Sequence, residues 1–439
     1  MDMDVDKHGE AAYALARRIY PIYRSVTGKG VRETFHILKE YLSDVGELVV
    51  HEVPSGTKVF DWTIPKEWII HDAFIEDEDG KKIIQFSDNC LHVVGYSTPV
   101  DKWVEYDDLI KIIHTQPDQP DVIPYVTSYY KEQYGFCMSE DQKKKLKKGR
   151  YHIYIDSELF DGFLSYAELK LRGQVDQEVL FSTYSCHPSM GNDNCSGIVL
   201  QTELAKYIGS KNGLHYSYHF VFLPETIGAI AFLSHKDNLM YLQSHCIGGY
   251  TLSCVGDDGD YSIIKTRSGK SLSDRILMNI LKHSHCYRGE VYREYSYLER
   301  GSDERQYNSP GVGLNITGFC RSKYWEFPEY HTSLDTIDFI SSAGLQGSFS
   351  IMRRVVESLE HNKIYMTKMP CEPQLGKRGL YPNTSQKGTY DNVEDMINFL
   401  GYADGKSDLV EISDLINVPM EKLILIAEKA LETDLIVEV

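Results

Sequence analysis

The chain has 439 residues, a length that allows a full-sized enzyme core together with additional domains. With 42% hydrophobic and 25% charged residues, its composition is that of a folded globular protein and excludes a collagenous or largely disordered chain. Acidic residues outnumber basic ones by 64 to 46, and the net charge of −18 disfavours nucleic acids and anionic lipid surfaces as partners.

Membrane insertion and secretion are not expected either. No apolar run approaches 18 residues, so we predict no membrane span. The first six residues include three aspartates and no basic residue, where a secretory signal would be basic and then apolar, and this favours a cytoplasmic location. The nine cysteines are scattered without a Cys-x-x-Cys pair, and we expect reduced thiols and no structural zinc site built from cysteines.

The first third of the chain combines helical and β-type patterns. Apolar spacing over residues 10–43 predicts a helical hairpin. Short apolar runs punctuated by Gly, Pro, Asp and Asn follow, and they predict an inserted β-rich domain over 48–149. Within it, the aromatic cluster 125–136 is typical of packing between insert and core, with a wall of a substrate subsite as the alternative.

From residue 150 onward strands and helices alternate. This pattern predicts an α/β fold: a mixed, mostly parallel sheet with helices on both faces, formed by residues 1–47 and 150–365. In such sheets, functional sites gather at the carboxyl ends of the strands.

In the C-terminal residues 366–439 we expect a linker followed by a winged-helix domain. The pattern of a helix, a tight turn, a second helix and a terminal strand predicts this domain. Residues 408–439 contain eight acidic side chains and two lysines, so binding in a DNA major groove is disfavoured. A protein contact, including a homo-oligomer, is the expected use of this domain.

Two polar side chains follow the apolar strand predicted at 178–185. His187 and Asp193 stand six residues apart on one loop, and imidazole and carboxylate are both normal zinc ligands. The alternative is structural, with Asp193 capping the next helix and His187 buried in the core.

Two further loops carry similar chemistry. Glu225 follows the strand predicted at 216–223, where partial desolvation would raise the pKa of its carboxyl toward that of a general base. Helix capping is the alternative. A third loop supplies His331, with Asp335 close behind to support it.

Together these loops resemble the zinc-dependent aminopeptidases with co-catalytic metals, a family related to leucyl aminopeptidases and glutaminyl cyclases. The resemblance rests on the order of His187, the stretch Asp193-Asn194-Cys195-Ser196-Gly197, Glu225, and His331-Thr332-Ser333-Leu334-Asp335. It implies that His187, Asp193 and His331 bind metal and that Glu225 is the catalytic base. The two extra domains are similar to those of a bacterial group of aminopeptidase-like proteins often associated with polysaccharide biosynthesis.

Two positions depart from the family pattern. Thr226 occupies the place of a second glutamate ligand, and Ser253 stands about where another aspartate ligand is expected. We therefore expect one zinc on His187, Asp193 and His331, with two as the alternative. The ligand set could instead be completed by Glu225, or by Asp257 or Asp258, or the site no longer catalyses.

The segment 300–306 resembles one that faces the pocket of related peptidases. Here Asp303 or Glu304 would hold a substrate ammonium group, and Arg305 or Arg321 a carboxylate. Ordinary surface ion pairs are the alternative.

The expected activity is hydrolysis of an amide next to a free amino group, in a small peptide or an aminoacyl conjugate. Two alternatives remain at this point: a glutaminyl-cyclase-like acyltransferase, and a non-catalytic ligand-binding or regulatory protein on a degenerate peptidase core.

Overall fold

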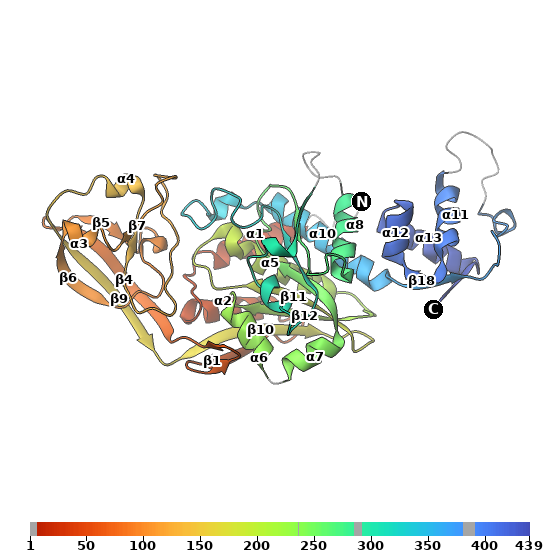
Figure 1. Ribbon diagram of the computed structural model, residues 1–439, viewed down its shortest axis with the longest axis horizontal. Helices are drawn as coiled ribbons and strands as arrows, with labels where there is room; N and C mark the ends of the chain where they lie inside the picture. Colours follow the sequence, from red (N-terminus) through yellow and green to blue (C-terminus); the bar gives the residue numbers. More distant parts are fainter. Residues whose placement is uncertain (1–6, 236, 285–291, 381–390) are drawn as a thin grey trace.

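Three regions lie in a row along the molecule in the computed structural model, which describes residues 7–235, 237–284, 292–380 and 391–439 (Figure 1). The inserted β domain forms one end, the α/β core lies in the middle, and the C-terminal domain forms the other end. The large mixed sheet and its helices confirm the predicted fold class.

The main sheet of the described residues has eight strands. In spatial order they are β1 (Val49–Pro54), β10 (Phe163–Leu171), β12 (Ser217–Leu223), β11 (Glu178–Tyr184), β13 (Cys246–Leu252), β16 (Ile316–Cys320), β14 (Ser262–Ile264) and β15 (Arg293–Tyr295). The central strands β12, β11, β13 and β16 are parallel. Their carboxyl ends therefore lie at one edge, where the loops with His187 and Glu225 begin.

Both faces of the sheet are covered, because alternate side chains of the buried strands point in opposite directions. Phe181 and Phe220 pack with one layer of helices and Leu180 and Val221 with the other. The first layer comprises α1 (Lys7–Ile19), α2 (Lys29–Tyr41), α5 (Gly197–Gly209), α8 (Leu272–Lys282) and α10 (Ser342–His361). The second comprises α6 (Ile227–Ser234), α7 (Asn238–His245) and α9 (Glu304–Tyr307).

The insert contains its own four-stranded sheet, in the order β5-β4-β9-β6. Its elements are β2 (Lys58–Val59), β3 (Trp62–Thr63), β4 (Glu67–Asp77), β5 (Lys82–Gln85), β6 (Val100–Glu105), α3 (Tyr106–Leu109), β7 (Ile113–His114), β8 (Phe136–Cys137), α4 (Glu140–Lys143) and β9 (Arg150–Phe160). Near the expected limits of 48 and 149, the strands divide between the two sheets. The strand β1 pairs with β10 in the main sheet, whereas β9 pairs with β4 and β6 in the insert.

The C-terminal domain is the predicted winged helix, formed by β17 (Ile364–Thr367), α11 (Asp391–Tyr402), β18 (Asp404–Asp408), α12 (Leu409–Ile416), α13 (Met420–Glu432) and β19 (Ile436–Glu438). The linker expected before it includes β17, and residues 381–390 lie outside the described residues. Arg275 of α8 donates two hydrogen bonds to Asp408, at 2.8 and 2.7 Å. Arg354 of α10 pairs with Glu421 in the first turn of α13. These two ion pairs attach the C-terminal domain to α8 and α10 of the core.

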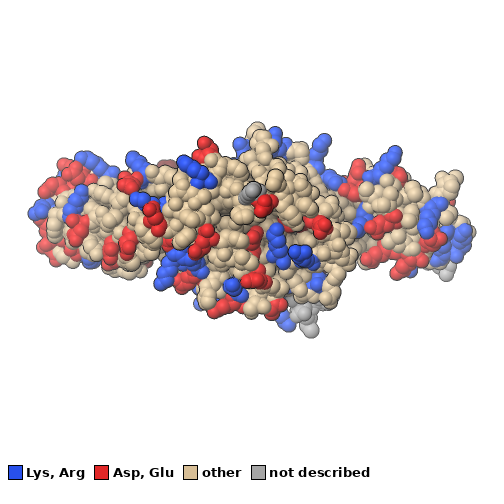
Figure 2. Space-filling model, turned by 90° about the horizontal axis from the view of Figure 1, so that it is seen from below, with Lys and Arg blue, Asp and Glu red and all other residues tan. Residues whose placement is uncertain are grey.

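On the face shown in Figure 2, acidic and basic side chains are interspersed and both signs occur at each end and in the middle of the molecule. Within the described residues, no helix has both the length and the apolar character needed to cross a membrane.

A buried histidine ties three strands of the main sheet together. His219 on β12 lies 2.8 Å from the carboxylate of Glu168 on β10 and 3.1 Å from that of Glu178 on β11. Burial alone would raise the pKa of Glu168, but the hydrogen bond with His219 and the charges of His219, His51 and Lys170 together outweigh it and lower this pKa from 4.5 to about 2. The ionised carboxylate therefore stabilises the fold above about pH 4.5, and this stabilisation is lost as the pH falls toward 2.

We expect Glu168→Gln to lower the free energy of unfolding at pH 7 by about 1 kcal/mol, because it removes a charge-assisted hydrogen bond from a partly buried site. Urea unfolding between pH 7 and pH 3 should show the difference from wild type shrinking as the pH falls. Glu158→Gln, at an exposed carboxylate that pairs with His71, should change little. A difference for Glu168→Gln that grows with acidity would contradict the assignment.

Candidate metal centre

His187 is presented by the loop that follows β11. Its side chain is buried, and its backbone carbonyl accepts a hydrogen bond from Nε of the buried Arg24 at 3.1 Å. Burial lowers the pKa of His187 to about 4, so its imidazole is neutral near pH 7. Neutral imidazole is the form that binds metal ions.

Asp193 lies in an irregular turn between this loop and α5. The backbone N–H groups of Asn192 and Asp193 donate to the two carboxylate oxygens of Asp335, at 2.6 and 2.8 Å. Asp335 therefore supports the turn of Asp193, whereas the sequence placed it behind His331. Burial raises the pKa of Asp335 to about 8, and the nearby charge of Asp193 adds to this increase. The two backbone hydrogen bonds act in the opposite direction and lower the pKa, but by less.

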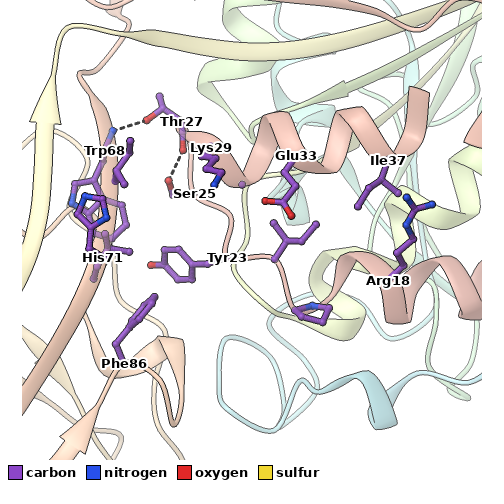
Figure 3. Close-up of a pocket in the computed structure, with 15 residues that line it drawn as sticks. Arg18, Tyr23, Ser25, Thr27, Lys29, Glu33, Ile37, Trp68, His71 and Phe86 are labelled. Carbon is purple, nitrogen blue, oxygen red and sulfur yellow. Dashed lines mark hydrogen bonds between the residues drawn. The ribbon is translucent and has the colours of Figure 1, made fainter. Parts of the chain in front are cut away.

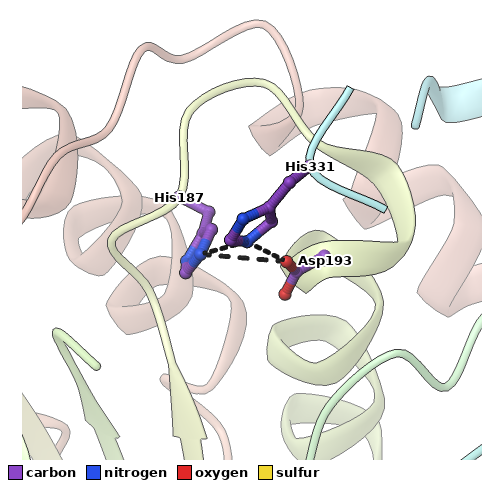
Figure 4. Close-up of side chains that lie close together, drawn as sticks. All are labelled: His187, Asp193 and His331. Carbon is purple, nitrogen blue, oxygen red and sulfur yellow. Dashed lines mark hydrogen bonds and ion pairs between the residues drawn. The ribbon is translucent and has the colours of Figure 1, made fainter. Parts of the chain in front are cut away.

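The ligand atoms of His187, Asp193 and His331 converge on one point (Figure 4). Nε2 of His331 lies 3.0 Å from Oδ2 of Asp193 and 3.2 Å from Nε2 of His187, and Nε2 of His187 lies 3.8 Å from the same oxygen. This oxygen is buried and has no well-aligned hydrogen-bond partner among the described residues. Two imidazole nitrogens around an unsatisfied carboxylate oxygen fit one divalent cation such as zinc.

The carboxylate of Asp193 is ionised in this setting. Burial alone would raise its pKa, but the two histidines and Tyr184 outweigh burial and lower it to about 2. The hydroxyl of Tyr184 donates to Oδ1, which leaves Oδ2 for the cation. Sequence reasoning missed Tyr184, although it is the last residue of β11 and its side chain could have been assigned to the site by the alternation along that strand.

Aromatic side chains surround the two histidines. The ring of Tyr330 stacks on His331 with a centroid distance of 3.9 Å. The ring of Tyr125, from the insert, lies 5.5 Å from His187 and 5.1 Å from His331. Part of the aromatic cluster that was expected to pack between insert and core therefore contacts the candidate ligands themselves.

Glu225 follows the neighbouring strand β12 and lies outside the three-ligand cluster. Its backbone N–H donates to Sγ of Cys186 at 3.2 Å. Burial raises the pKa of its carboxyl to about 7, with a further contribution from the charge of Asp193. The next residue, Thr226, has φ of +63°, which is a strained conformation for a β-branched residue and is typical of functional sites.

The two positions that depart from the aminopeptidase pattern have other partners. The backbone N–H of Thr226 donates to Asp303 at 2.7 Å, and its hydroxyl accepts from Arg305. Ser253 is buried with its hydroxyl 3.6 Å from Sγ of Cys320.

The two aspartates considered as substitute ligands are also engaged elsewhere. Asp257 accepts from the side chains of Asn192 and Ser322, at 2.8 and 2.9 Å, and Asp258 accepts from the hydroxyl of Ser341 at 2.7 Å. Neither carboxylate joins the cluster.

The candidate substrate-binding residues divide into two groups. Asp303 lies beside Glu225, whose charge adds to burial in raising the pKa of Asp303, and Oδ2 of Asp303 has no hydrogen-bond partner among the described residues. Oε1 of Glu304 accepts from the backbone of Gly301 at 2.8 Å and from the hydroxyl of Tyr324 at 2.6 Å, while its Oε2 also has no hydrogen-bond partner among the described residues. The guanidinium of Arg321 donates to the carbonyls of Gly259 and Gly344.

A cavity lies away from the candidate metal centre, where the turn between α1 and α2 meets the insert. It has a volume of about 640 Å³, and Tyr23, Trp68, His71 and Phe86 contribute to its lining (Figure 3). None of the three candidate ligands lines it.

The core has the fold of the zinc aminopeptidases. The crystal structure of a zinc aminopeptidase from Bacillus subtilis matches with a TM-score of 0.59 over 81% of this chain and 95% of that one. The two sequences are 13% identical, so the likeness concerns the fold alone.

The chain belongs to the family described as "Domain of unknown function (DUF4910)", whose model matches residues 13–362. A winged helix-turn-helix model matches residues 363–438. A Clostridium acetobutylicum protein named "Putative polysaccharide biosynthesis protein with aminopeptidase-like domain" is 42% identical over 408 residues, which are 92% of this chain and 91% of that protein. The crystal structure of a "putative peptidase" from Clostridium acetobutylicum, 39% identical, matches with a TM-score of 0.90 over 99% of this chain and 98% of that one.

We predict that Asp193→Asn abolishes metal binding, because it removes the only negative charge among the three ligands. Elemental mass spectrometry of protein purified without chelator should find about one zinc per wild-type chain and close to none in the variant. Asp258→Asn is the matched control and should retain the metal. Equal zinc contents in Asp193→Asn and wild type would refute the site.

The hydroxyl of Tyr184 orients Asp193, so Tyr184→Phe should weaken zinc binding by about 10- to 100-fold while the three ligands stay in place. Competition with a fluorescent zinc chelator measures this change. Tyr207→Phe, at a hydroxyl that bonds to Glu357 away from the centre, should leave the affinity unchanged. Unaltered zinc affinity in Tyr184→Phe would show that this hydrogen bond does not position the ligand.

Proposed function

We propose that this protein is a zinc-dependent, aminopeptidase-like hydrolase that cleaves an amide bond next to a free amino group, in a small peptide or an aminoacyl conjugate. One observation carries the proposal: two imidazole nitrogens and an unsatisfied carboxylate oxygen converge at the carboxyl edge of the sheet, one strand away from Glu225. The name of the Clostridium acetobutylicum relative, which includes an aminopeptidase-like domain, supports it.

His187, Asp193 and His331 would hold the zinc. When bound, zinc would polarise the scissile carbonyl and lower the pKa of a water molecule. The three ligands supply one negative charge and two neutral nitrogens, which suits an open catalytic site.

Glu225 would move the proton. A carboxyl with a pKa of about 7 can accept a proton from the attacking water near neutral pH and return it to the leaving nitrogen. Its partly desolvated position at the end of β12 is the physical cause of that pKa, and a cation bound nearby would lower it.

Asp303 is the best placed of the candidates for the substrate amino group. Its buried, unsatisfied oxygen could accept from an ammonium group, whose positive charge would also stabilise the ionised form of Asp303. Arg305, which donates to the hydroxyl of Thr226, would hold this side of the site in place.

A non-catalytic binding protein is the second candidate, because Thr226 and Ser253 stand where the related aminopeptidases have ligands and both have other partners here. The two candidates differ in the consequence of losing Glu225. A binding protein needs only its ligands, whereas a hydrolase also needs the base.

We predict that Glu225→Gln retains zinc but lowers kcat for aminoacyl p-nitroanilides by about 10²- to 10⁴-fold. Steady-state kinetics on zinc-loaded protein, with zinc content measured in parallel, makes the comparison. Glu329→Gln, near His331 in sequence but without a proposed role, is the control and should keep wild-type kcat. Turnover by Glu225→Gln at the wild-type rate would contradict the mechanism, and absence of turnover in zinc-loaded wild type across a panel of aminoacyl amides would favour the binding protein.

A further inference from the structure

A smaller pocket lies on the insert, and one of its lining residues, Tyr129, contacts Tyr125 beside the candidate metal centre. It has a volume of about 250 Å³ and lies between the β2–β3 hairpin and the segment 128–132. Its lining combines apolar, aromatic and polar side chains: Thr63, Ile64, Pro65, Lys66, Tyr96, Ser128, Tyr129, Tyr130, Lys131, Glu132 and Leu159.

Exposed aromatic side chains form a rim at this pocket. Trp62 is 41% exposed and Tyr130 57% exposed, and their ring centroids lie 5.9 Å apart. The hydroxyl of Tyr130 donates to the carbonyl of Thr63 at 3.1 Å, which fixes this ring to the hairpin. We call Trp62 and Tyr130 the aromatic rim.

The hairpin turn beside the rim is strained. Phe60 is 60% exposed and has φ of +52°, an unfavourable conformation for a large side chain. Three large aromatic side chains, one of them on a strained backbone, therefore leave much of their surface exposed. Exposed apolar groups gathered at a pocket are typical of ligand binding.

The pocket is joined to the metal centre through two tyrosines. Tyr129 lines the pocket, and its hydroxyl lies 3.4 Å from that of Tyr125, whose ring contacts both His187 and His331. On the other side, Val59 of β2 packs in one apolar cluster with Ile227, two residues after Glu225. Side chains of the pocket wall are therefore in contact with side chains beside the metal centre.

We propose that the pocket and its aromatic rim bind the saccharide part of the substrate, so that the substrate is an aminoacyl group joined by an amide to an amino sugar. The faces of aromatic rings carry partial negative charge and attract the C–H groups on one face of a pyranose ring. Lys66, Lys131 and Glu132 at the same pocket offer donors and acceptors to sugar hydroxyls.

This assignment rests on the proposed hydrolase function for the reaction itself. The amide C–N bond breaks and a C–O bond forms from water. Glu225 takes one water proton and passes it to the nitrogen, so that the amino sugar and a free amino acid are released. The polysaccharide biosynthesis in the name of the relative agrees with such a substrate.

The binding step can be tested apart from cleavage with the full-length Glu225→Gln protein on arrays of bacterial oligosaccharides and of tripeptides. We expect binding to saccharides, weakened about tenfold or more by Trp62→Ala and by Tyr130→Ala in this background. Trp103→Ala is the matched control, because Trp103 is 43% exposed on β6 of the same insert and stacks on His152 away from the pocket. It should bind like the parent.

Two results would overturn the proposal. In the first, the parent protein binds no saccharide more tightly than its Trp62→Ala variant does. In the second, tripeptide binding depends on the rim and saccharide binding does not. Equal melting temperatures of the variants exclude unfolding as a cause.

Leucinamide, whose leaving group is ammonia and does not reach the pocket, separates this proposal from the proposed function. Cleavage of leucinamide by zinc-loaded wild type without any saccharide binding would overturn the saccharide site and leave the hydrolase intact. Saccharide binding that depends on the rim, with no cleavage of aminoacyl amino sugars or leucinamide, would overturn the hydrolase and leave the saccharide site.

Discussion

The buried carboxylate of Asp193 is the constraint around which the centre of the molecule is organised. An ionised carboxylate away from water is costly unless it is paired, and here two imidazoles and the hydroxyl of Tyr184 surround it. Asp335 holds the backbone of the same turn through two N–H groups. These contacts join two segments from distant parts of the chain: residues 184–193, at the carboxyl end of β11, and the loop 330–335.

The insert contributes to this edge and is more than an appendage. Pro124 forms a β-bridge with Thr332, and the backbone N–H of Tyr125 donates to the carbonyl of His331 at 2.9 Å. The loop that carries His331 is therefore held by the insert as well as by the core. Since Tyr125 also contacts both histidines, the insert shapes the space in which a substrate would lie.

The fold and the three converging side chains could be predicted because they follow from strand-end positions and ligand chemistry. His187, Asp193 and His331 meet as expected. The sheet that each of β1 and β9 joins could not be predicted, because both segments have clear strand patterns but the sequence does not reveal their pairing partners. The structural role of Arg321 was likewise hidden, since its partners are backbone carbonyls that leave no pattern in the sequence.

The central claim is that one zinc binds to His187, Asp193 and His331. The most direct test is a crystal structure of the zinc-loaded protein, with anomalous difference maps recorded on both sides of the zinc absorption edge. The account predicts a single strong peak between the two Nε2 atoms and Oδ2 of Asp193. A peak at another site, or no zinc peak in protein with full zinc content, would contradict it.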